Sequence, residues 1–373
     1  MKLILLSILV FANIHYIRGN GIRIPLSIYD EASHKYSDGT YMDHQGLYGT
    51  ISIGTPPQKI NVLLSRTYTS IYVLSSYCSS SAVCQNHNTY NHKISTTFRG
   101  GDDFDTKIRQ DINHYGVEAT DTITIGNFQI QDVSVLVITS GEDYDNKPYD
   151  STVGLLPGSE FLKSCEKLGL KKKFSFYTNS PWDNNTSELM LCGEDKTKFR
   201  GNMQYLTVGA TGYKGWVVTK LRIMLHHNHE KMPKMESQDA IQDVRLLFFD
   251  FASSYIIGPY DDIERIYRKL NTRRSKIRDD LQEVDCNNIH ALPSITFGTA
   301  DSNFTLTGND YIKQMTQNDE RVCIVRLLSH SQNFWTIGSV FFRKYYTVFD
   351  AEQNRIGFAE SVHPPAKIMV FLF

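Results

Sequence analysis

Apolar and polar residues alternate with a period of two along much of this chain, a pattern that predicts β-strands. The strand-like runs are rich in valine, isoleucine, threonine, phenylalanine and tyrosine, and glycine and asparagine punctuate them. Helical spacing is confined to short stretches. One spans 160–168, and another carries Ile263, Ile266, Tyr267 and Leu270 on one face. The chain is therefore predicted to be all-β with a few short helices.

Two segments repeat one hydrophobic pattern, in which an apolar strand enters a small polar turn and a second apolar strand follows. The first segment covers 61–73 and the second covers 246–259. The turn begins at Ser65 in the first segment and at Asp250 in the second, 185 residues later. This repeat predicts two lobes, each of which presents one loop to a shared cleft.

Both segments resemble the active-site loops of the pepsin-like aspartic proteases, where each apolar strand ends in Asp-Thr-Gly. Further segments are similar to other motifs of this family, in the family's order: 48–58 with its Gly-Thr-Pro turn, 150–156, 173–177, 335–350 and 355–359. The resemblance covers nearly the whole chain beyond its first 35 residues. It implies a bilobal pepsin-like acid protease fold with a central cleft.

The resemblance also implies a catalytic pair of carboxylates, of which this chain keeps one. Asp250 stands at the second catalytic position, whereas Ser65 replaces the aspartate at the first. In this family the two carboxylates share one proton, so that one activates water while the other donates to the scissile carbonyl. A serine hydroxyl stays protonated at acidic and neutral pH and cannot replace either. We interpret the site as degenerate.

Neighbouring positions of both loops depart from the family in the same direction. Where the family has threonine and glycine, the chain has Arg66 and Thr67 in the first loop, and Phe251 and Ala252, followed by Ser253, in the second. Glycine lets a backbone approach closely, and a side chain at that position prevents this. These substitutions support the interpretation of a degenerate site.

The hairpin that covers the cleft in this family, the flap, has also changed. Its tyrosine falls at Arg109 and its first glycine at Gln110. Arg66 stands where the family buries a threonine, and a buried arginine needs a partner. We expect Arg66 to reach Asp250, Ser339 or solvent in the cleft.

Two functions remain open. The first is a catalytically inactive, secreted homologue that binds a peptide or protein through its cleft or surface, for example by strand addition. The alternative is an aspartic endopeptidase with residual or altered activity that uses Asp250. A structural or storage role is compatible with the same residues. We expect a monomer, and no cofactor.

Composition and charge limit the classes of protein to which this chain can belong. The 373 residues are 41% hydrophobic and 12% aromatic, enough for a sizeable core in two lobes. The net charge of −1 gives no reason to expect nucleic-acid or electrostatic membrane binding. Residues 1–19 have the pattern of a secretory signal peptide, and no later apolar run is long enough to span a bilayer. We expect a secreted protein without a membrane span.

Five segments are predicted. The signal peptide at 1–19 precedes a truncated propeptide-like segment at 20–35, which could instead form the outer strand of a sheet. The N-terminal lobe is placed at 36–205 and the C-terminal lobe at 206–363. An apolar tail follows at 364–373.

Six cysteines agree with an oxidising compartment. The resemblance implies two bridges, Cys78 with Cys84 and Cys286 with Cys323. Cys165 and Cys192 are left over, and either a third bridge or two buried thiols is compatible with their positions. Glycosylation sequons occur at Asn184, Asn185 and Asn303.

Two clusters of polar residues have simple structural interpretations. Residues 226–230 contain three histidines and a glutamate, but their position favours a hairpin turn over a metal site, so no metal is expected. Residues 265–278 carry seven basic side chains, which fit the solvated face of a helix better than a docking patch.

Overall fold

The computed structural model describes residues 21–30, 34–35, 41–42, 45–78, 84, 86–101, 115–139, 147–179, 187–209, 213, 215–226, 240–244, 246–251, 253–299 and 301–363. Strands dominate these residues, and their α-helices are only four to eleven residues long. The predicted all-β class is confirmed.

A thirteen-stranded sheet runs through the molecule in the order β13-β28-β27-β11-β12-β1-β4-β5-β10-β6-β9-β8-β7. Its strands are β1 (Ile22–Asp30), β4 (Gln45–Ile53), β5 (Gln58–Ser65), β6 (Ile71–Leu74), β7 (Arg99–Gly100), β8 (Gly116–Ile125), β9 (Phe128–Ile138), β10 (Ser151–Gly154), β11 (Lys173–Tyr177), β12 (Ser187–Leu191), β13 (Phe199–Thr207), β27 (Tyr345–Asp350) and β28 (Arg355–Ser361).

The remaining strands form smaller sheets. One has the order β14-β17-β26-β18-β25: β14 (Val217–Val218), β17 (Leu247–Phe249), β26 (Trp335–Ile337), β18 (Ile256–Pro259) and β25 (Leu327–His330). A second comprises β16 (Ala240–Val244), β15 (Leu221–His226), β21 (Ser294–Gly298) and β22 (Asn303–Leu306). A third comprises β19 (Arg273–Arg274), β20 (Gln282–Glu283), β24 (Glu320–Val325) and β23 (Ile312–Gln317). The short strands β2 (His34–Lys35) and β3 (Tyr41–Met42) pair with each other.

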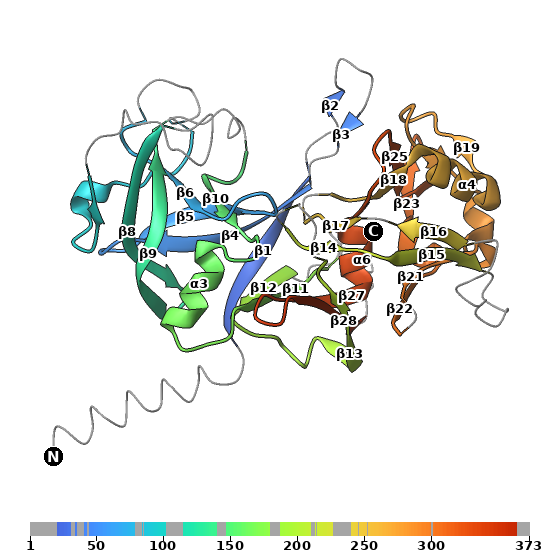
Figure 1. Ribbon diagram of the computed structural model, residues 1–373. Helices are drawn as coiled ribbons and strands as arrows, with labels where there is room; N and C mark the ends of the chain where they lie inside the picture. The colour runs from blue at the N-terminus through green and yellow to red at the C-terminus, as the bar shows by residue number, and fades with distance from the viewer. Residues whose placement is uncertain are drawn as a thin grey trace, which may run out of the picture.

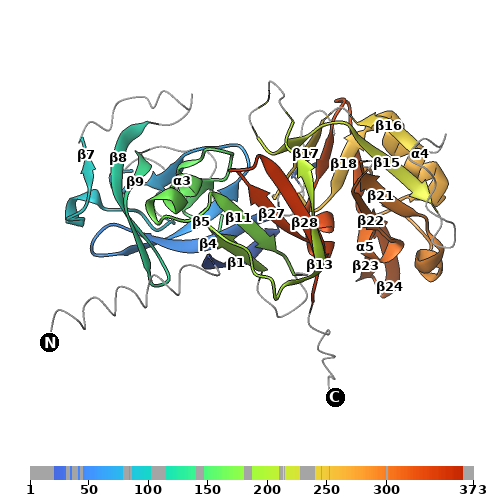
Figure 2. The same cartoon turned by 60° about the horizontal axis from the view of Figure 1, so that its bottom comes forward.

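The molecule has two halves that lie side by side (Figure 1). We call the strands β4–β13 the N-terminal half and the strands β14–β26 the C-terminal half. After the C-terminal half, the chain returns as β27 and β28, and β27 pairs antiparallel with β11 of the N-terminal half. In Figure 2, β27 and β28 lie beside β11 and β13, between the rest of the N-terminal half and the C-terminal half. The last two strands therefore tie the halves together.

The first described strand, β1, lies inside the large sheet. It pairs antiparallel with β12 on one side and with β4 on the other. Its buried side chains alternate with exposed ones, and Ile22, Ile24 and Leu26 are at most 2% exposed. The expectation of an outer strand is wrong, because both edges of β1 are paired. A propeptide-like origin for this segment stays a prediction.

Two helices, α3 and α4, lie where the helical spacing predicts them. α3 (Glu160–Lys167) begins after Ser159, whose hydroxyl accepts the Leu162 N–H at 3.4 Å, an N-cap bond. α4 (Tyr260–Leu270) buries the four predicted apolar side chains. α5 (Gly308–Tyr311) and α6 (Ser339–Lys344) are shorter, and η1 (His92–Ile94) and η2 (Cys286–Ala291) are 3₁₀ turns. In the described part of the chain, no helix has the length and hydrophobicity needed to cross a membrane.

Candidate functional site

The first predicted loop begins where β5 ends, at Ser65. β10 lies parallel to β5, with Gly154 opposite Ser65, and antiparallel to β6 on its other side. The Leu155 N–H donates to the Ser65 carbonyl at 2.8 Å, and the Gly154 N–H donates to the Ser70 carbonyl at 2.9 Å. These bonds fix both ends of the loop.

The second predicted loop is built on the same plan. β26 lies parallel to β17, with Ile337 opposite Phe249, and antiparallel to β18. The Asp250 N–H donates to the Ile337 carbonyl at 2.9 Å, and the Ser339 N–H donates to the Ser253 carbonyl at 2.8 Å. The pairing registers place Asp250 in its half where Ser65 stands in the other, as the sequence repeat predicted.

Each loop packs against a glycine at the end of the neighbouring strand at the same point, where the two backbone segments nearly touch. A Cβ on Gly154 would lie 2.2 Å from the Tyr68 carbonyl oxygen, and a Cβ on Gly338 would lie 2.3 Å from that of Ser253. Tyr68 and Ser253 each stand three residues beyond the head of their loop. The crowding requires glycine at both crossings, because a Cβ would overlap the neighbouring backbone.

An ion pair joins the two loops across the halves. Nε of Arg66 lies 2.9 Å from Oδ2 of Asp250, and the carboxylate side chain is 15% exposed while the arginine side chain is 39% exposed. Arg66 thus reaches one of the partners expected from the sequence. Its guanidinium therefore engages one of the two oxygens of the Asp250 carboxylate.

The Ser65 side chain forms hydrogen bonds within its own loop. Its hydroxyl lies 2.9 Å from the Thr67 hydroxyl and accepts the Thr67 N–H at 3.2 Å. This arrangement is a local turn of the kind that serine side chains commonly form with the backbone two residues on. In the second loop Ser253 does the same, because its hydroxyl accepts the Tyr255 N–H at 3.1 Å.

Phe251 anchors the second loop through apolar contacts. It is 1% exposed and belongs to a set of rings that we call the aromatic cluster. The cluster comprises Phe174, Phe176, Phe249, Phe251, Phe342 and Phe349, with centroids of contacting rings 4.7–6.5 Å apart. Because Phe174 and Phe176 come from β11, the cluster packs the loop of the C-terminal half against a strand of the N-terminal half. The sequence pattern did not predict this contact.

Several predicted positions lie outside the described residues. They are Arg109 and Gln110 of the flap, Ala252, and the sequon residues Asn184 and Asn185. The strand after the flap is described as part of β8. Asn303 is exposed at the start of β22, an edge strand.

All three cysteine pairs are bridged: Cys78 with Cys84, Cys165 with Cys192 and Cys286 with Cys323. The bridge left open by the sequence, Cys165–Cys192, joins α3 to the residue after β12. Three disulfides are typical of proteins from oxidising compartments.

The histidine-rich segment begins at the end of β15. His226 is 9% exposed, and its Nε2 lies 2.9 Å from the Thr296 hydroxyl. The rest of that segment, 227–230, is not among the described residues. Across the residues that are described, no group of three or more histidine, cysteine or acidic side chains is arranged to hold a metal ion.

Comparison with known proteins agrees with this architecture. The family model described as eukaryotic aspartyl protease matches residues 46–361. Cathepsin D of Dictyostelium discoideum is 26% identical over 358 residues, which cover 92% of this chain and 87% of that protein. Pepsin A of Canis lupus familiaris is 28% identical over 337 residues, covering 86% and 82%. Gastricsin of Cavia porcellus is 27% identical over 341 residues, covering 87% and 82%.

Proposed function

Because the chain belongs to the eukaryotic aspartyl protease family, we propose that it is a catalytically inactive member that binds a peptide or protein through its interlobe cleft or surface. The observation that carries the proposal is the ion pair between Arg66 and Asp250, in a site whose other aspartate position holds Ser65. A site with one carboxylate, already paired to a cation, lacks the parts that the family's reaction uses.

The chemistry explains why this pairing argues against catalysis. An aspartic protease holds two carboxylates that share a proton, one of them poised to take a proton from water. Ser65 cannot supply the second carboxylate, and its hydroxyl is committed to Thr67. The only carboxylate left at the two loop heads, Asp250, already has one of its two oxygens, Oδ2, engaged by the Arg66 guanidinium. The pair of carboxylates that the acid–base exchange uses is therefore incomplete.

Binding does not need those carboxylates. An extended peptide can add to exposed strand edges through backbone hydrogen bonds, and side-chain pockets then supply selectivity. The loops held by backbone hydrogen bonds, and the halves joined through β27 and β11, supply a scaffold for such a cleft that does not depend on a second carboxylate. The ligand we propose is accordingly an extended peptide or a protein segment.

The first test is proteolysis by the purified mature chain. Denatured casein is incubated with the wild type, with Asp250→Ala and with the wild type plus pepstatin, from pH 3 to 7. We expect no cleavage that depends on Asp250. Cleavage abolished both by pepstatin and by Asp250→Ala would contradict the proposal and establish the alternative, an endopeptidase of altered activity.

The binding half of the proposal needs its own measurement. The immobilised chain is exposed to a tryptic digest of casein, and retained peptides are identified by mass spectrometry, with the heat-unfolded chain as control. We expect a reproducible subset of peptides to be retained only by the folded chain. Equal retention by both forms would contradict cleft or surface binding.

We further propose that the chain is a secreted glycoprotein. Its first 19 residues have the pattern of a signal peptide, and Asn303 is exposed on an edge strand where a glycan has room. When the full chain is expressed in a eukaryotic secretory host, Asn303→Gln is expected to lower the mass by one glycan. An unchanged mass after this substitution would show that the Asn303 sequon is unused.

A further inference from the structure

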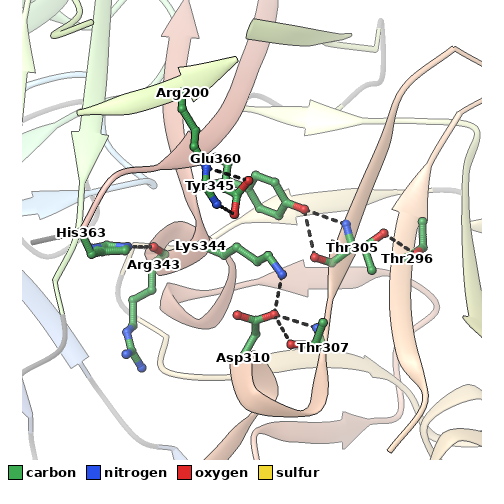
Figure 3. A network of polar contacts seen from close by, with 10 residues as sticks. All are labelled: Arg200, Thr296, Thr305, Thr307, Asp310, Arg343, Lys344, Tyr345, Glu360 and His363. Carbon is green, nitrogen blue, oxygen red and sulfur yellow. Dashed lines mark hydrogen bonds and ion pairs between the residues drawn. The ribbon is translucent and has the colours of Figure 1, made fainter. Parts of the chain in front are cut away.

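Two edge strands of the C-terminal half have outer backbone groups that tyrosine side chains already bind. On β22, the Tyr345 hydroxyl accepts the Thr305 N–H at 2.7 Å and donates to the Thr305 carbonyl at 2.9 Å (Figure 3). On β25, the Tyr267 hydroxyl donates to the Leu327 carbonyl at 2.7 Å. These hydroxyls occupy backbone groups to which another strand would otherwise pair.

The remaining edge strands differ in length and regularity. β13 and β16 pair irregularly, with a register shift against their neighbours β28 and β15. The strands β2, β3, β7, β14 and β19 have only two residues each. β23 has six residues and pairs with β24 without a shift. Among the edge strands of the described sheets, β23 is therefore the longest one with regular pairing. Short and irregular edges discourage pairing with another chain, and β23 lacks both protections.

The turn between β23 and β24 determines which backbone groups of β23 point outward. Two residues, Asn318 and Asp319, join the strands, and both have positive φ, as in a type I′ turn. Gln317 and Glu320, which flank the turn, are then a hydrogen-bonded pair. Such pairs alternate with non-bonded pairs along an antiparallel ladder.

Gln314 and Thr316 belong to the non-bonded pairs, so their N–H and C=O groups point away from β24. The bond from the Arg326 N–H to the Tyr311 carbonyl, at 2.8 Å, agrees with this alternation. Both Gln314 and Thr316 are exposed. Within the described residues, the main chain of neither has a hydrogen-bond partner. Four outward backbone groups are therefore available to an added strand.

One face of β23 continues an apolar surface. Met315 lies opposite Val322. It is partly buried against a cluster that includes Tyr255, Ile324 and Leu328. A strand added to β23 would place one of its own side chains beside Met315, and cross-strand neighbours of this kind stabilise a sheet when both are apolar.

We propose that β23 is the strand to which the ligand of this protein adds, and that this ligand is an extended peptide with an apolar residue beside Met315. The inference rests on the peptide binding proposed above and assigns it to one edge of the C-terminal half. The outward groups of Gln314 and Thr316 supply the main-chain hydrogen bonds that give strand addition its affinity. Six residues at about 3.4 Å each make an edge roughly 20 Å long, which matches about six residues of an extended ligand.

The substitution Thr316→Pro tests the assignment, because it removes a donor of the outer edge while the ladder to β24 does not use that donor. Proline has no N–H and is tolerated on edge strands in this orientation. The probe is the peptide that the wild type retains most strongly from a tryptic digest of casein, resynthesised with a fluorescent label and titrated by anisotropy. We expect Thr316→Pro to bind it about tenfold more weakly than the wild type. Thr316→Ala keeps the N–H and is the matched control, with unchanged affinity.

N-methylation of the probe tests strand addition on the unaltered protein. Only alternate amides of an added strand face β23. We expect methyl groups on that set of amides to abolish binding, and methyl groups on the other set to be tolerated. The thermal midpoint of Thr316→Pro is measured beside that of the wild type to show that the variant is folded.

The outcomes separate this inference from the proposed function. Equal affinity of Thr316→Pro and Thr316→Ala for the probe, or equal effects of the two methylation patterns, would overturn the assignment to β23 while peptide binding itself stands. No peptide retained by the wild type would overturn both proposals. A wild-type dimer in sedimentation that Thr316→Pro dissociates would assign the edge to a second copy of the chain and overturn the peptide as its occupant.

Discussion

The roles of single residues in this protein can be predicted only in part from the neighbouring sequence. Ser65 and Asp250 could be matched from the sequence, since each ends the same strand–turn–strand pattern. Arg66 could be expected to seek a partner because of its position, but Asp250 was one of three candidates. The destination of Phe251 could not be predicted, since the rings that surround it lie about 75 to 100 residues away in the chain.

The Arg66–Asp250 contact predicts a measurable coupling between two residues of different halves. In a double-mutant cycle of Arg66→Gln and Asp250→Asn, we expect a coupling free energy of about 0.5–1 kcal/mol, since the arginine is partly solvated. Urea unfolding of the four proteins measures it. The control cycle is Arg265→Gln with Asp262→Asn on α4, where the atoms are 3.5 Å apart, and a smaller coupling is expected. Coupling indistinguishable from zero at Arg66 would sink the interpretation.

Glu188 of β12 predicts a pH dependence. Burial raises the pKa of this carboxyl, even though Arg23 lies 3.1 Å away and lowers it. A raised pKa in the folded state means that the native chain binds the proton more readily, so Glu188 contributes increasing stability as pH falls through the folded pKa toward 4.5.

In Glu188→Gln this contribution is absent. The free energy of unfolding of the wild type, minus that of the variant, is therefore expected to increase as pH falls from 7 to 4.5. Urea unfolding at each pH measures the difference, and Glu320→Gln on the exposed face of β24 is the control for loss of one carboxylate. A difference that is constant with pH would contradict the assignment.

At the scale of elements, periodicity and resemblance predict much of the structure. The helices at α3 and α4 follow from local spacing, and the motifs of the family predict two of the three disulfides. The place of β1 could not be read in this way. Its alternation shows that one face is buried, but the identity of its two neighbours depends on strands far along the chain.

The interior position of β1 predicts unequal effects along one strand. Ile24→Ala removes a side chain that is 1% exposed and is expected to cost about 2–4 kcal/mol of unfolding free energy. Ser27→Ala, on the exposed face of the same strand, is expected to change it by no more than about 0.5 kcal/mol. Chemical denaturation of both variants checks this. Similar losses in the two would argue that β1 is not packed as described.

At the scale of the molecule, the two halves are joined by common structural elements. The thirteen-stranded sheet contains the strands of the N-terminal half and the last two strands of the chain, and the aromatic cluster joins β11 to β17, β27 and α6. The sequence predicted two lobes from the repeat. It did not predict how firmly they are joined, because strand order is a long-range property.

The aromatic cluster predicts cooperative unfolding of the two halves. Phe251→Ala is expected to cost about 3–5 kcal/mol and to separate the unfolding into two transitions, because the variant weakens the packing between halves more than the core of either. Calorimetry of the wild type and variant measures both effects. Phe128→Ala, at the start of β9 and outside the cluster, is the control and should retain one transition. A single sharp transition in Phe251→Ala would contradict this role.

The position of β1 also has a consequence for how the chain is made. β1 leaves the ribosome before the other described strands, yet one of its two partners, β12, is synthesised roughly 160 residues later. At a synthesis rate of about 5–20 residues per second, β1 has one unpaired edge for roughly 10–30 s before β12 is made. Such an edge can pair with another chain. Newly made chains are therefore most exposed to mispairing in the interval before β12 leaves the ribosome.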